Sequence, residues 1–159
     1  MSTRVNHYQA APALVNTLMN ASAALKKSSL TPTLKHLIDL RASQLNGCAF
    51  CVDMHCKEAR MAGERELRLH HVAVWRESPL FSAREKAALA LTEALTHIDK
   101  TGVCDALYQE AREHFTETEI AEIVFAIAII NSWNRLQLVS QMAPGSQDAA
   151  FGLDRAGLE

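Results

Sequence analysis

The chain has 159 residues, a length that fits one domain of ordinary size. Hydrophobic residues make up 48% of it and charged residues 21%, the formal net charge is -2, and the sequence pI is about 6.4. This balance is that of a globular protein, and it excludes the strongly basic surface with which proteins bind nucleic acids electrostatically. We therefore expect one folded domain and no nucleic-acid partner.

No stretch of the sequence predicts export or insertion into a membrane. The first eight residues lack the apolar run of a secretion signal. The most apolar run, residues 120–130, is interrupted by Glu122 and is shorter than the roughly 20 residues that a membrane-spanning helix needs. We expect a cytoplasmic protein with no membrane partner. In such a reducing compartment, the four cysteines are more often free, redox-active or metal-bound than joined in structural disulfides.

Helical periodicity runs through most of the chain, and glycine and proline are scarce, with six and four residues. The pattern predicts an all-α domain of about seven helices. In chain order, the predicted helices cover roughly residues 12–27, 31–46, 48–62, 64–75, 82–97, 103–114 and 116–142. The tail after Pro144 has little periodicity, and we expect it to wander over the surface.

Short sequence signals place several helix ends. Thr31 followed by Pro32 suits a helix start, because threonine caps and proline fits the first turn. Residues 82–85 and 116–119 have the spacing of capping boxes. Gly63 suits the position just after a helix. These signals divide the chain into well-bounded helices.

The last predicted helix is apolar around most of its circumference. The residues that make it so are Ile120, Ile123, Val124, Ile127, Ile130 and Trp133. Such a helix usually sits in the middle of a bundle or in a subunit interface. Within it, we interpret Trp133 and Asn134 as core residues rather than substrate contacts.

The most informative pattern is Cys-x-x-Cys-x-x-x-His at residues 48–55. In a helix, Cys48, Cys51 and His55 fall on one stripe spanning two turns. Gly47 lets the chain turn tightly, so the cysteines come in the first helical turn, where free N–H groups and the helix dipole stabilise a thiolate. His55 is placed to accept the thiol proton, directly or through a water. An activated thiolate, a base and a second thiol that can close a disulfide make a dithiol redox cycle.

Two other interpretations of the cysteines compete with this one. Buried cysteine is common in helices, so the pair by itself is equally consistent with simple packing. A zinc site would take Cys48, Cys51, His55 and Cys56, but Cys56 lies well off the stripe and one straight helix cannot surround an ion tetrahedrally. We therefore predict no metal and no cofactor, and we expect Cys56 and Cys104 to be packed, inert thiols.

Residues 40–55, Leu-Arg-Ala-Ser-Gln-Leu-Asn-Gly-Cys-Ala-Phe-Cys-Val-Asp-Met-His, resemble the core motif of the AhpD-like alkyl hydroperoxidase family. That family belongs to the carboxymuconolactone decarboxylase superfamily. Further similar segments are residues 58–63, 82–97 and 130–135. The resemblance covers roughly residues 34–142, which would form the core of a single AhpD-like domain spanning residues 1–159.

The resemblance implies an AhpD-like helical bundle, association into a homotrimer or homohexamer, and thiol-dependent reduction of a peroxide substrate. It also implies an external dithiol reductant, for example one of the lipoyl type. By this resemblance, Cys51 corresponds to the peroxide-attacking cysteine, Cys48 to the resolving cysteine and His55 to the proton-relay histidine.

Two positions depart from the family pattern. The family's relay glutamate, twelve residues before the first cysteine, is replaced by His36, and a histidine that directly precedes the second cysteine is replaced by Phe50. Phe50 cannot relay a proton. His36 can, but it cannot supply a negative charge, so we rank it last among the candidate catalytic residues Cys51, Cys48, His55 and His36.

The leading interpretation is a thiol-dependent peroxidase with a Cys-x-x-Cys redox pair and a histidine proton relay. One alternative is a non-enzymatic dithiol sensor that passes an oxidation signal to a partner. The other is an enzyme like the carboxymuconolactone decarboxylases, although that branch of the superfamily lacks the cysteine pair.

Overall fold

The computed structural model describes residues 4–158, and within them every regular element is helical. The elements in chain order are α1 (His7–Ala10), α2 (Pro12–Leu25), α3 (Pro32–Leu45), α4 (Ala49–Met61), α5 (Glu66–His71), the 3-10 turn η1 (Val72–Val74), α6 (Ala83–Thr96), α7 (Asp105–His114), α8 (Glu117–Ser140), α9 (Asp148–Phe151) and the 3-10 turn η2 (Asp154–Ala156). The prediction of an all-α fold is confirmed.

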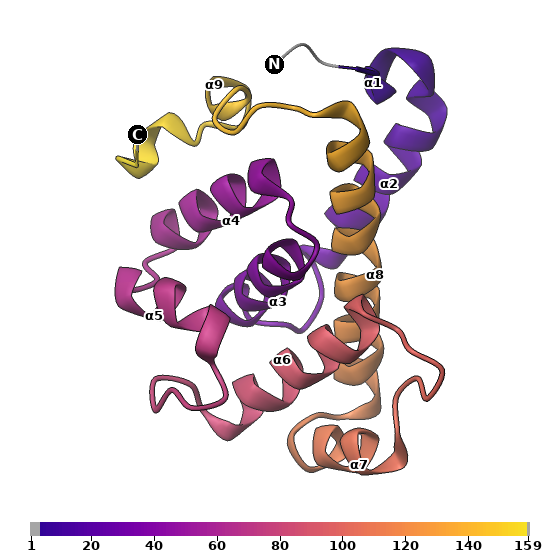
Figure 1. The fold of residues 1–159 in the computed structure, drawn as a ribbon, viewed down its shortest axis with the longest axis vertical. Helices are drawn as coiled ribbons and strands as arrows, with labels where there is room; N and C mark the ends of the chain where they lie inside the picture. Colours follow the sequence, from indigo (N-terminus) through magenta and orange to yellow (C-terminus); the bar gives the residue numbers. More distant parts are fainter. Residues whose placement is uncertain (1–3, 159) are drawn as a thin grey trace.

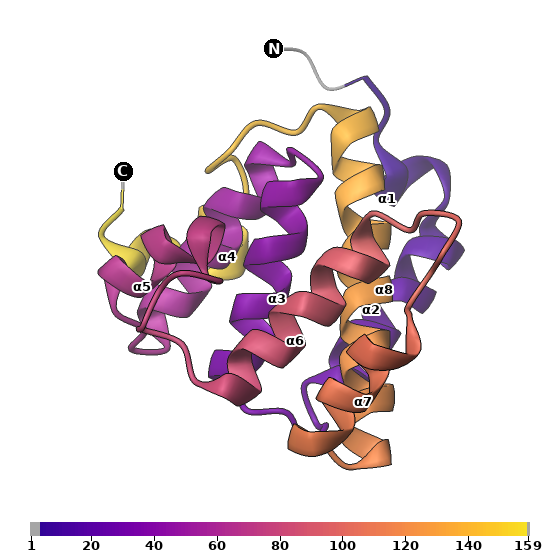
Figure 2. The same ribbon diagram turned by 60° about the horizontal axis from the view of Figure 1, so that its bottom comes forward.

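Helix α3 lies at the centre of the molecule, with α4, α6 and α8 packed around it (Figure 1). Helix α2 packs along α8 on the side away from the rest of the bundle, and α7 closes the end of α6 and α8 (Figure 2). Both cysteines of the predicted redox pair lie where α3 ends and α4 begins. The central helix therefore leads directly into the candidate site.

The helix starts follow the sequence signals. The side chain of Thr31 accepts a hydrogen bond from the backbone N–H of Leu34, and Pro32 occupies the first turn of α3. Complete capping boxes open α6 and α8, at residues 82–85 and 116–119. Because each cap satisfies backbone groups that the helix leaves unpaired, local sequence fixes these ends.

Two apolar clusters form the core. The larger one joins α3, α6, α7 and α8 through residues that include Ile38, Leu91 and Ile123. The second joins α3 to α4, α5 and α6, and it includes Leu37 and Leu89. Helix α3 contributes to both clusters, because Ile38 belongs to the larger one and Leu37 to the second, and both are fully buried. Burial of two faces holds α3 in one rotation about its axis.

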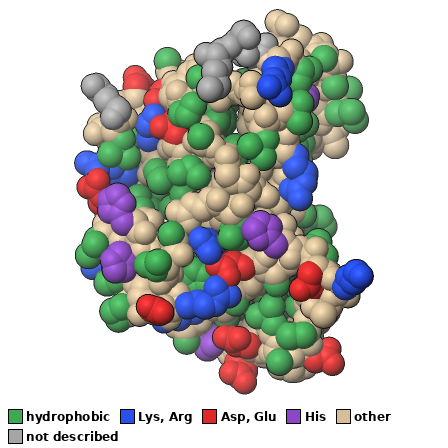
Figure 3. Space-filling view, viewed as in Figure 1, with side chains coloured by type: hydrophobic (Ala, Val, Ile, Leu, Met, Phe, Trp, Pro, Cys, Tyr) green, Lys and Arg blue, Asp and Glu red, His purple; other side chains and the backbone are tan. Residues whose placement is uncertain are grey.

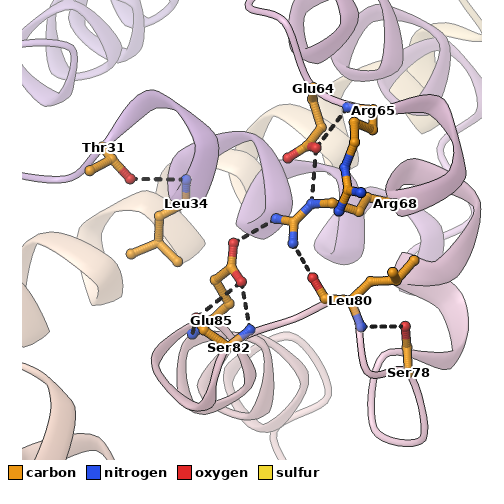
Figure 4. Close-up of polar contacts among 9 residues, drawn as sticks. All are labelled: Thr31, Leu34, Glu64, Arg65, Arg68, Ser78, Leu80, Ser82 and Glu85. Atoms are coloured by element: carbon orange, nitrogen blue, oxygen red, sulfur yellow. Dashed lines mark hydrogen bonds and ion pairs between the residues drawn. The ribbon is translucent and has the colours of Figure 1, made fainter.

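A buried arginine joins α5 to the start of α6 (Figure 4). The guanidinium of Arg68 donates to Glu64 at 2.9 Å, to Glu85 at 2.6 Å and to the backbone carbonyl of Leu80. Glu85 also closes the capping box with Ser82. A buried charge must be paired to be tolerated, and here three acceptors surround it.

Helix α8 is buried on one side and exposed on the other. Ile123, Ile127 and Ile130 are buried, whereas Phe125 keeps 66% of its surface exposed and Val139 keeps 56%. Within residues 4–158, it is the one helix long and apolar enough to cross a bilayer by length and composition, with 44% of its most apolar window buried. Core helices of globular proteins meet the same criteria, and α8 packs against α2, α3 and α6.

Charged side chains of both signs are interspersed over the face shown in Figure 3. Acidic side chains gather at its lower end, where Figure 1 places α7. Helix α8 begins nearby with Glu117 and Glu119 in its first turn, where the helix dipole favours negative charge. Neither sign covers this face, in keeping with the formal net charge of -2.

Three expectations about local structure are wrong. The helix predicted for residues 64–75 is shorter, because it ends at His71 and continues as the 3-10 turn η1. The tail after Pro144 is not an irregular surface segment, because it forms α9 and η2 and buries Leu153 and Ala156. Cys104 is exposed at the N-cap of α7 rather than packed.

Candidate functional site

The turn between α3 and α4 presents the cysteine pair. Gly47 has a φ of +67°, a left-handed conformation that glycine adopts without strain. The backbone N–H of Cys48 then donates to the carbonyl of Ser43 at 3.0 Å, which ties the turn back to α3. Cys48 is the N-cap of α4, and its sulfur accepts the backbone N–H of Cys51 at 3.3 Å. The sulfur of Cys48 therefore sits where the unpaired N–H groups of a helix stabilise negative charge.

Cys48 and Cys51 are joined by a disulfide, with their Cα atoms 5.3 Å apart. Both are almost fully buried, at 2% and 1% exposure, and they pack with Phe50, Met54 and Met142. The prediction that this pair can close a disulfide is confirmed by this arrangement. Any molecule that reacts with either sulfur must reach it through an internal space rather than at the outer surface.

Such a space lies beside Cys51. A cavity of about 320 Å³ opens between α2, α3, α4 and α8, with Tyr8 and Phe151 at its edge. Cys51 and His55 both line it, whereas Cys48 does not. The remaining lining residues are Met19, Ser22, Ala23, Leu25, Lys26, Lys35, Asp39, Phe50, Met54, Glu58, Ile129, Ile130, Trp133 and Gln137. Most of these side chains are apolar or aromatic. The charged ones are Lys26, which follows α2, Lys35 and Asp39 on α3, and Glu58 on α4.

His55 is buried one turn after Cys51, as the helical stripe predicts. Its Nδ1 lies 2.8 Å from Oε2 of Glu58 and 4.0 Å from Oδ2 of Asp39. An ionised carboxylate only accepts, so Nδ1 carries a hydrogen and donates it to Glu58. Nε2 is buried and has no hydrogen-bond partner among the described residues. In a neutral ring, that nitrogen holds the free lone pair.

Charges from α3 and α4 meet around His55. Burial by itself would raise the pKa of Glu58, but the hydrogen bond from His55 and the charges of His55, Lys35 and His36 together lower it to about 2. Lys35 donates to Asp39 at 2.5 Å. Burial opposes the charge of Lys35, but the carboxylates of Asp39 and Glu58 outweigh it and raise the pKa of this lysine. The carboxylate of Glu58 is therefore ionised at neutral pH.

His36 lies behind this cluster. It is half-buried on α3 and does not line the cavity, and its buried Nδ1 has no hydrogen-bond partner in the described part of the chain. Burial is the largest influence on it and lowers its pKa, which keeps the imidazole neutral at pH 7. The structure brings Cys51, Cys48 and His55 together and leaves His36 one step removed. Its catalytic role stays a prediction.

An uncharged network supports the turn from α8. The side-chain amide of Asn46 donates to both Asn131 and Asn134 at 2.9 Å. Asn134 is fully buried, as predicted, and donates to the hydroxyl of Ser43 at 3.0 Å. Trp133 differs from its expected core position, because it is half-buried, donates to Ser22 and lines the cavity. This network fixes the residues that precede Cys48.

Cys56, Cys104 and Asp53 do not line the cavity. Cys56 is half-buried, and burial followed by the charge of Asp53 raises the pKa of its thiol. Asp53 forms a salt bridge with Lys57 at 2.9 Å. Between residues 4 and 158, no group of three or more His, Cys, Asp or Glu side chains is arranged to hold a metal ion.

Sequence reasoning missed Glu58, Asp39 and Lys35 as part of the site. Glu58 follows His55 by three residues on the same helix, and this spacing alone could have suggested the pair. Asp39 and Lys35 are neighbours at the same kind of spacing on α3. Their approach to His55 depends on how α3 docks on α4, which no local pattern encodes.

The profile of the Carboxymuconolactone decarboxylase family matches residues 9–94 of the chain. The uncharacterized protein YdfG of Bacillus subtilis (strain 168) is 44% identical over 138 residues, which cover 87% of this chain and 94% of YdfG. The uncharacterized protein YnjA of Escherichia coli (strain K12) is 37% identical over 107 residues, which cover 67% of this chain and 58% of YnjA.

Solved structures agree with the sequence relatives. An Agrobacterium tumefaciens protein of unknown function, which carries the name of the antioxidant defence protein AhpD, superposes with a TM-score of 0.86 and 40% identity over 90% of this chain and 98% of its own. An uncharacterized peroxidase-related protein with an alkylhydroperoxidase AhpD core, from Ralstonia eutropha JMP134, gives a TM-score of 0.78 at 24% identity over 88% of this chain and 75% of its own, a likeness of fold alone. The chain therefore belongs to the carboxymuconolactone decarboxylase family, as an AhpD-like member.

Proposed function

We propose that the protein is a thiol-dependent peroxidase in which Cys51 attacks the peroxide and Cys48 resolves the product. The observation that carries the proposal is the placement of the two sulfurs. Cys51 lines the cavity together with His55, while Cys48 lies outside it, bonded to Cys51 at the helix N-terminus. One sulfur can meet a substrate, and the other can meet only its partner.

The reaction follows from this placement. The thiolate of Cys51 attacks the terminal oxygen of a hydroperoxide, the O–O bond breaks, and the leaving alkoxide takes a proton to become an alcohol. Cys51 is left as a sulfenic acid. The thiolate of Cys48 then attacks the Cys51 sulfur and expels the oxygen as water, which gives the disulfide. Two electrons from an external dithiol return both cysteines to thiols.

His55 supplies the acid and base steps. Its Nε2 has no hydrogen-bond partner among residues 4–158, and His55 lines the same cavity as Cys51. In the dithiol form, Nε2 can accept the proton of Cys51 and later give a proton to the leaving alkoxide. The same group thus activates the nucleophile and assists the leaving group.

The cavity wall favours organic hydroperoxides over hydrogen peroxide. Phe50, Met54 and Trp133 border the space beside Cys51, and most of the other lining side chains are apolar. Transfer of an apolar substituent from water to such a wall is favourable by about 25 cal/mol for each Å² of apolar surface that is buried. We expect the reducing dithiol to use the same entrance, because both cysteines are almost fully buried and Cys51 lines the cavity.

Steady-state turnover tests the proposal. Reduced protein is mixed with cumene hydroperoxide and excess dihydrolipoamide, and cumyl alcohol is quantified against protein. We expect many alcohol molecules per protein in the wild type and none in Cys51→Ser. When the dithiol is left out, Cys48→Ser should form one alcohol per protein and stop, with Cys51 held as a sulfenic acid that a dimedone probe labels. A wild type that oxidises once and does not turn over would instead support the sensor interpretation.

We further propose that the protein works as a homo-oligomer in the cytoplasm. Helix α8 leaves apolar side chains exposed, among them Phe125, Leu138 and Val139. Exposed apolar area of this kind on one helix often marks a contact between subunits. Light scattering should give a mass several times the 17.5 kDa of one chain, and a monomer at micromolar concentration would contradict the proposal.

A further inference from the structure

We propose that Glu58 is the positioning residue of His55, and that it supplies from α4 the negative charge that the family pattern places at position 36 on α3. This inference rests on the proposed function, because it explains how the thiol base of that site is held. It names a residue that the sequence pattern does not mark. It also explains how the site can tolerate His36 where a glutamate is expected.

The contact between the two side chains is direct. Nδ1 of His55 donates to Oε2 of Glu58 at 2.8 Å, three residues further along the same helix. A carboxylate at Nδ1 fixes the tautomer and the orientation of an imidazole, and it stabilises the imidazolium that forms when the other nitrogen takes a proton. With Nδ1 so held, the lone pair of Nε2 is available to the thiol of Cys51. Glu58 thereby acts on the sulfur through His55.

A second carboxylate near the ring is already engaged. Oδ2 of Asp39 lies 4.0 Å from Nδ1 of His55, beyond hydrogen-bond distance, and it accepts from Lys35 at 2.5 Å. The ammonium of Lys35 neutralises Asp39, so this carboxylate offers little net charge to the imidazole. Glu58 has no lysine or arginine within salt-bridge distance among the described residues, and its negative charge is directed at His55.

Position 36 is poorly suited to the same task. His36 is neutral at pH 7, because burial lowers its pKa, and its Nδ1 bonds to nothing in the described chain. It does not line the cavity that Cys51 and His55 share. The groups that face His55 are therefore Glu58 on α4 and Lys35, His36 and Asp39 on α3, with Lys26 at the edge of the same cavity. Among these, Glu58 alone combines negative charge with a hydrogen bond to the ring.

The proton transfer balances without a further reactant. The Cys51 thiol gives its proton to Nε2, which leaves a thiolate and an imidazolium. The imidazolium keeps its Nδ1 hydrogen in the bond to Glu58, and no electron changes hands. When the O–O bond of the peroxide breaks, the proton on Nε2 goes to the alkoxide, and His55 returns to its neutral form.

The test measures the reactivity of Cys51 as a single thiol. All variants carry Cys48→Ser, Cys56→Ser and Cys104→Ser, and the rate of alkylation by iodoacetamide is followed from pH 4 to pH 10. We expect Glu58→Gln to raise the pH midpoint of alkylation and to slow the reaction with cumene hydroperoxide at pH 7 by about 10–100-fold, as loss of such orienting partners typically does. Glu58→Asp keeps the charge and should recover part of the loss.

Two matched variants serve as controls. Asp39→Asn removes the other carboxylate near the ring, and His36→Ala removes the residue at the family's glutamate position. Both should shift the alkylation midpoint less than Glu58→Gln does. The inference would be overturned if the pH profile of Cys51 alkylation were the same with Glu58→Gln as without it. A larger shift of the alkylation midpoint in either control would also overturn it.

A spectroscopic readout separates positioning from folding. In wild-type protein, nitrogen NMR of labelled histidine should show His55 protonated on Nδ1 above pH 8, and Glu58→Ala should produce a mixture of the two tautomers. An unchanged tautomer would overturn the inference even if alkylation slowed. These readouts do not depend on peroxide turnover. If the wild type fails to turn over but the midpoint and tautomer shift as expected, the proposed function falls and the role of Glu58 stands.

Discussion

The turn that carries the cysteines is flanked by two buried polar networks that differ in kind. The network toward α8 is uncharged, and it consists of Ser43, Asn46, Asn131 and Asn134. The network toward the cavity is charged, and it consists of Lys35, Asp39, His55 and Glu58. Every buried side-chain N and O atom of the uncharged network has a hydrogen-bond partner, whereas Nε2 of His55 in the charged one has none.

This difference distinguishes a network that stabilises the turn from one that holds a reactive group. A fully satisfied buried network favours one arrangement and adds to stability, because any other arrangement leaves polar groups unpaired. A buried nitrogen without a partner costs stability, and it persists where the fold around it is held firmly. In this protein, that nitrogen lies on the histidine beside Cys51, where a proton must be received and returned. The amide network holds the turn, and the charged network is left free to react.

The largest effect is expected when the unsatisfied nitrogen is removed. We expect His55→Ala to slow the reaction of Cys51 with cumene hydroperoxide at pH 7 by about 10²–10⁴-fold, the range typical of general-base assistance. The midpoint of the urea denaturation curve should also fall modestly, because the same buried ring donates a hydrogen bond from Nδ1 to Glu58. Stopped-flow kinetics and urea titration of the same protein measure both quantities.

The control for this variant is His36→Ala, which removes the other unpartnered ring. Its effect on peroxide reaction should be smaller, since His36 does not line the cavity. Equal rates in wild-type and His55→Ala protein would reduce His55 to a packed helix residue. A greater loss in His36→Ala would show that the proton passes through position 36 instead.

The opposite pattern is expected in the uncharged network. Asn134→Ala leaves the hydroxyl of Ser43 and the amide of Asn46 each without one partner. Each lost partner typically costs about 1–3 kcal/mol, so the loss of two should lower the free energy of unfolding by about 2–6 kcal/mol. The alkylation midpoint of Cys51 should stay within experimental error in whatever fraction remains folded. Ser132→Ala on the exposed side of the same helix is the matched control, and it should leave both quantities unchanged.

The pair of His55 and Glu58 also makes stability depend on pH. Because the pKa of Glu58 is about 2 in the folded protein and its ordinary value is 4.5, the contribution of its charge is complete above about pH 4.5. It is lost as the pH falls toward 2. At pH 6, we expect the free energy of unfolding of the wild type to exceed that of Glu58→Gln by about 1–2 kcal/mol. This figure allows for solvent screening, because the Glu58 side chain is 31% exposed. Urea denaturation at pH 6, 4 and 3 should show the gap narrowing, and a constant gap would contradict the charge-based account.

Local signals in the sequence were enough to locate the helices and the thiols. Thr31 and the two capping boxes act within one turn, so their effect can be read without tertiary contacts. The same holds for Cys48, Cys51 and His55, which share one helix and therefore one stripe. The disulfide and the shared cavity wall follow from that stripe.

Residues that meet only through packing could not be found in this way. Asp39 approaches His55 because the burial of Leu37 and Ile38 fixes the rotation of α3 against α4. The sequence of the tail predicts a surface segment, because its few apolar residues show no helical period. Leu153 is nevertheless buried, since η2 contacts α4. Burial of an aperiodic segment is decided by the surface that it meets and not by its own pattern.

The smallest expected effect concerns the contact that fixes this tail, and it tests whether charge alone makes a network functional. Lys57 on α4 is buried and bonds to Asp53 at 2.9 Å and to Asp148 of α9 at 2.6 Å, while Asp53 also accepts the backbone N–H of Gly145. This cluster is charged like the one around His55, but each of its buried side-chain polar atoms has a partner. Because its hydrogen bonds are satisfied, we expect this cluster to stabilise the fold and to have no effect on the reactivity of Cys51.

We therefore expect Asp148→Asn to lower the free energy of unfolding by no more than about 1 kcal/mol, the usual scale for a partly exposed ion pair. Proteolytic cleavage within residues 143–158 should become faster, because the tail loses one of the contacts that hold it on α4. Lys57→Met is the matched variant, and it should loosen the tail further, since it also leaves Asp53 without its cation. In both variants, the alkylation midpoint of Cys51 should equal that of wild type. A shifted alkylation midpoint would mean that the tail is part of the reactive site, through Phe151 at the edge of the cavity. It would also mean that satisfied hydrogen bonds do not distinguish a stabilising network from a reactive one.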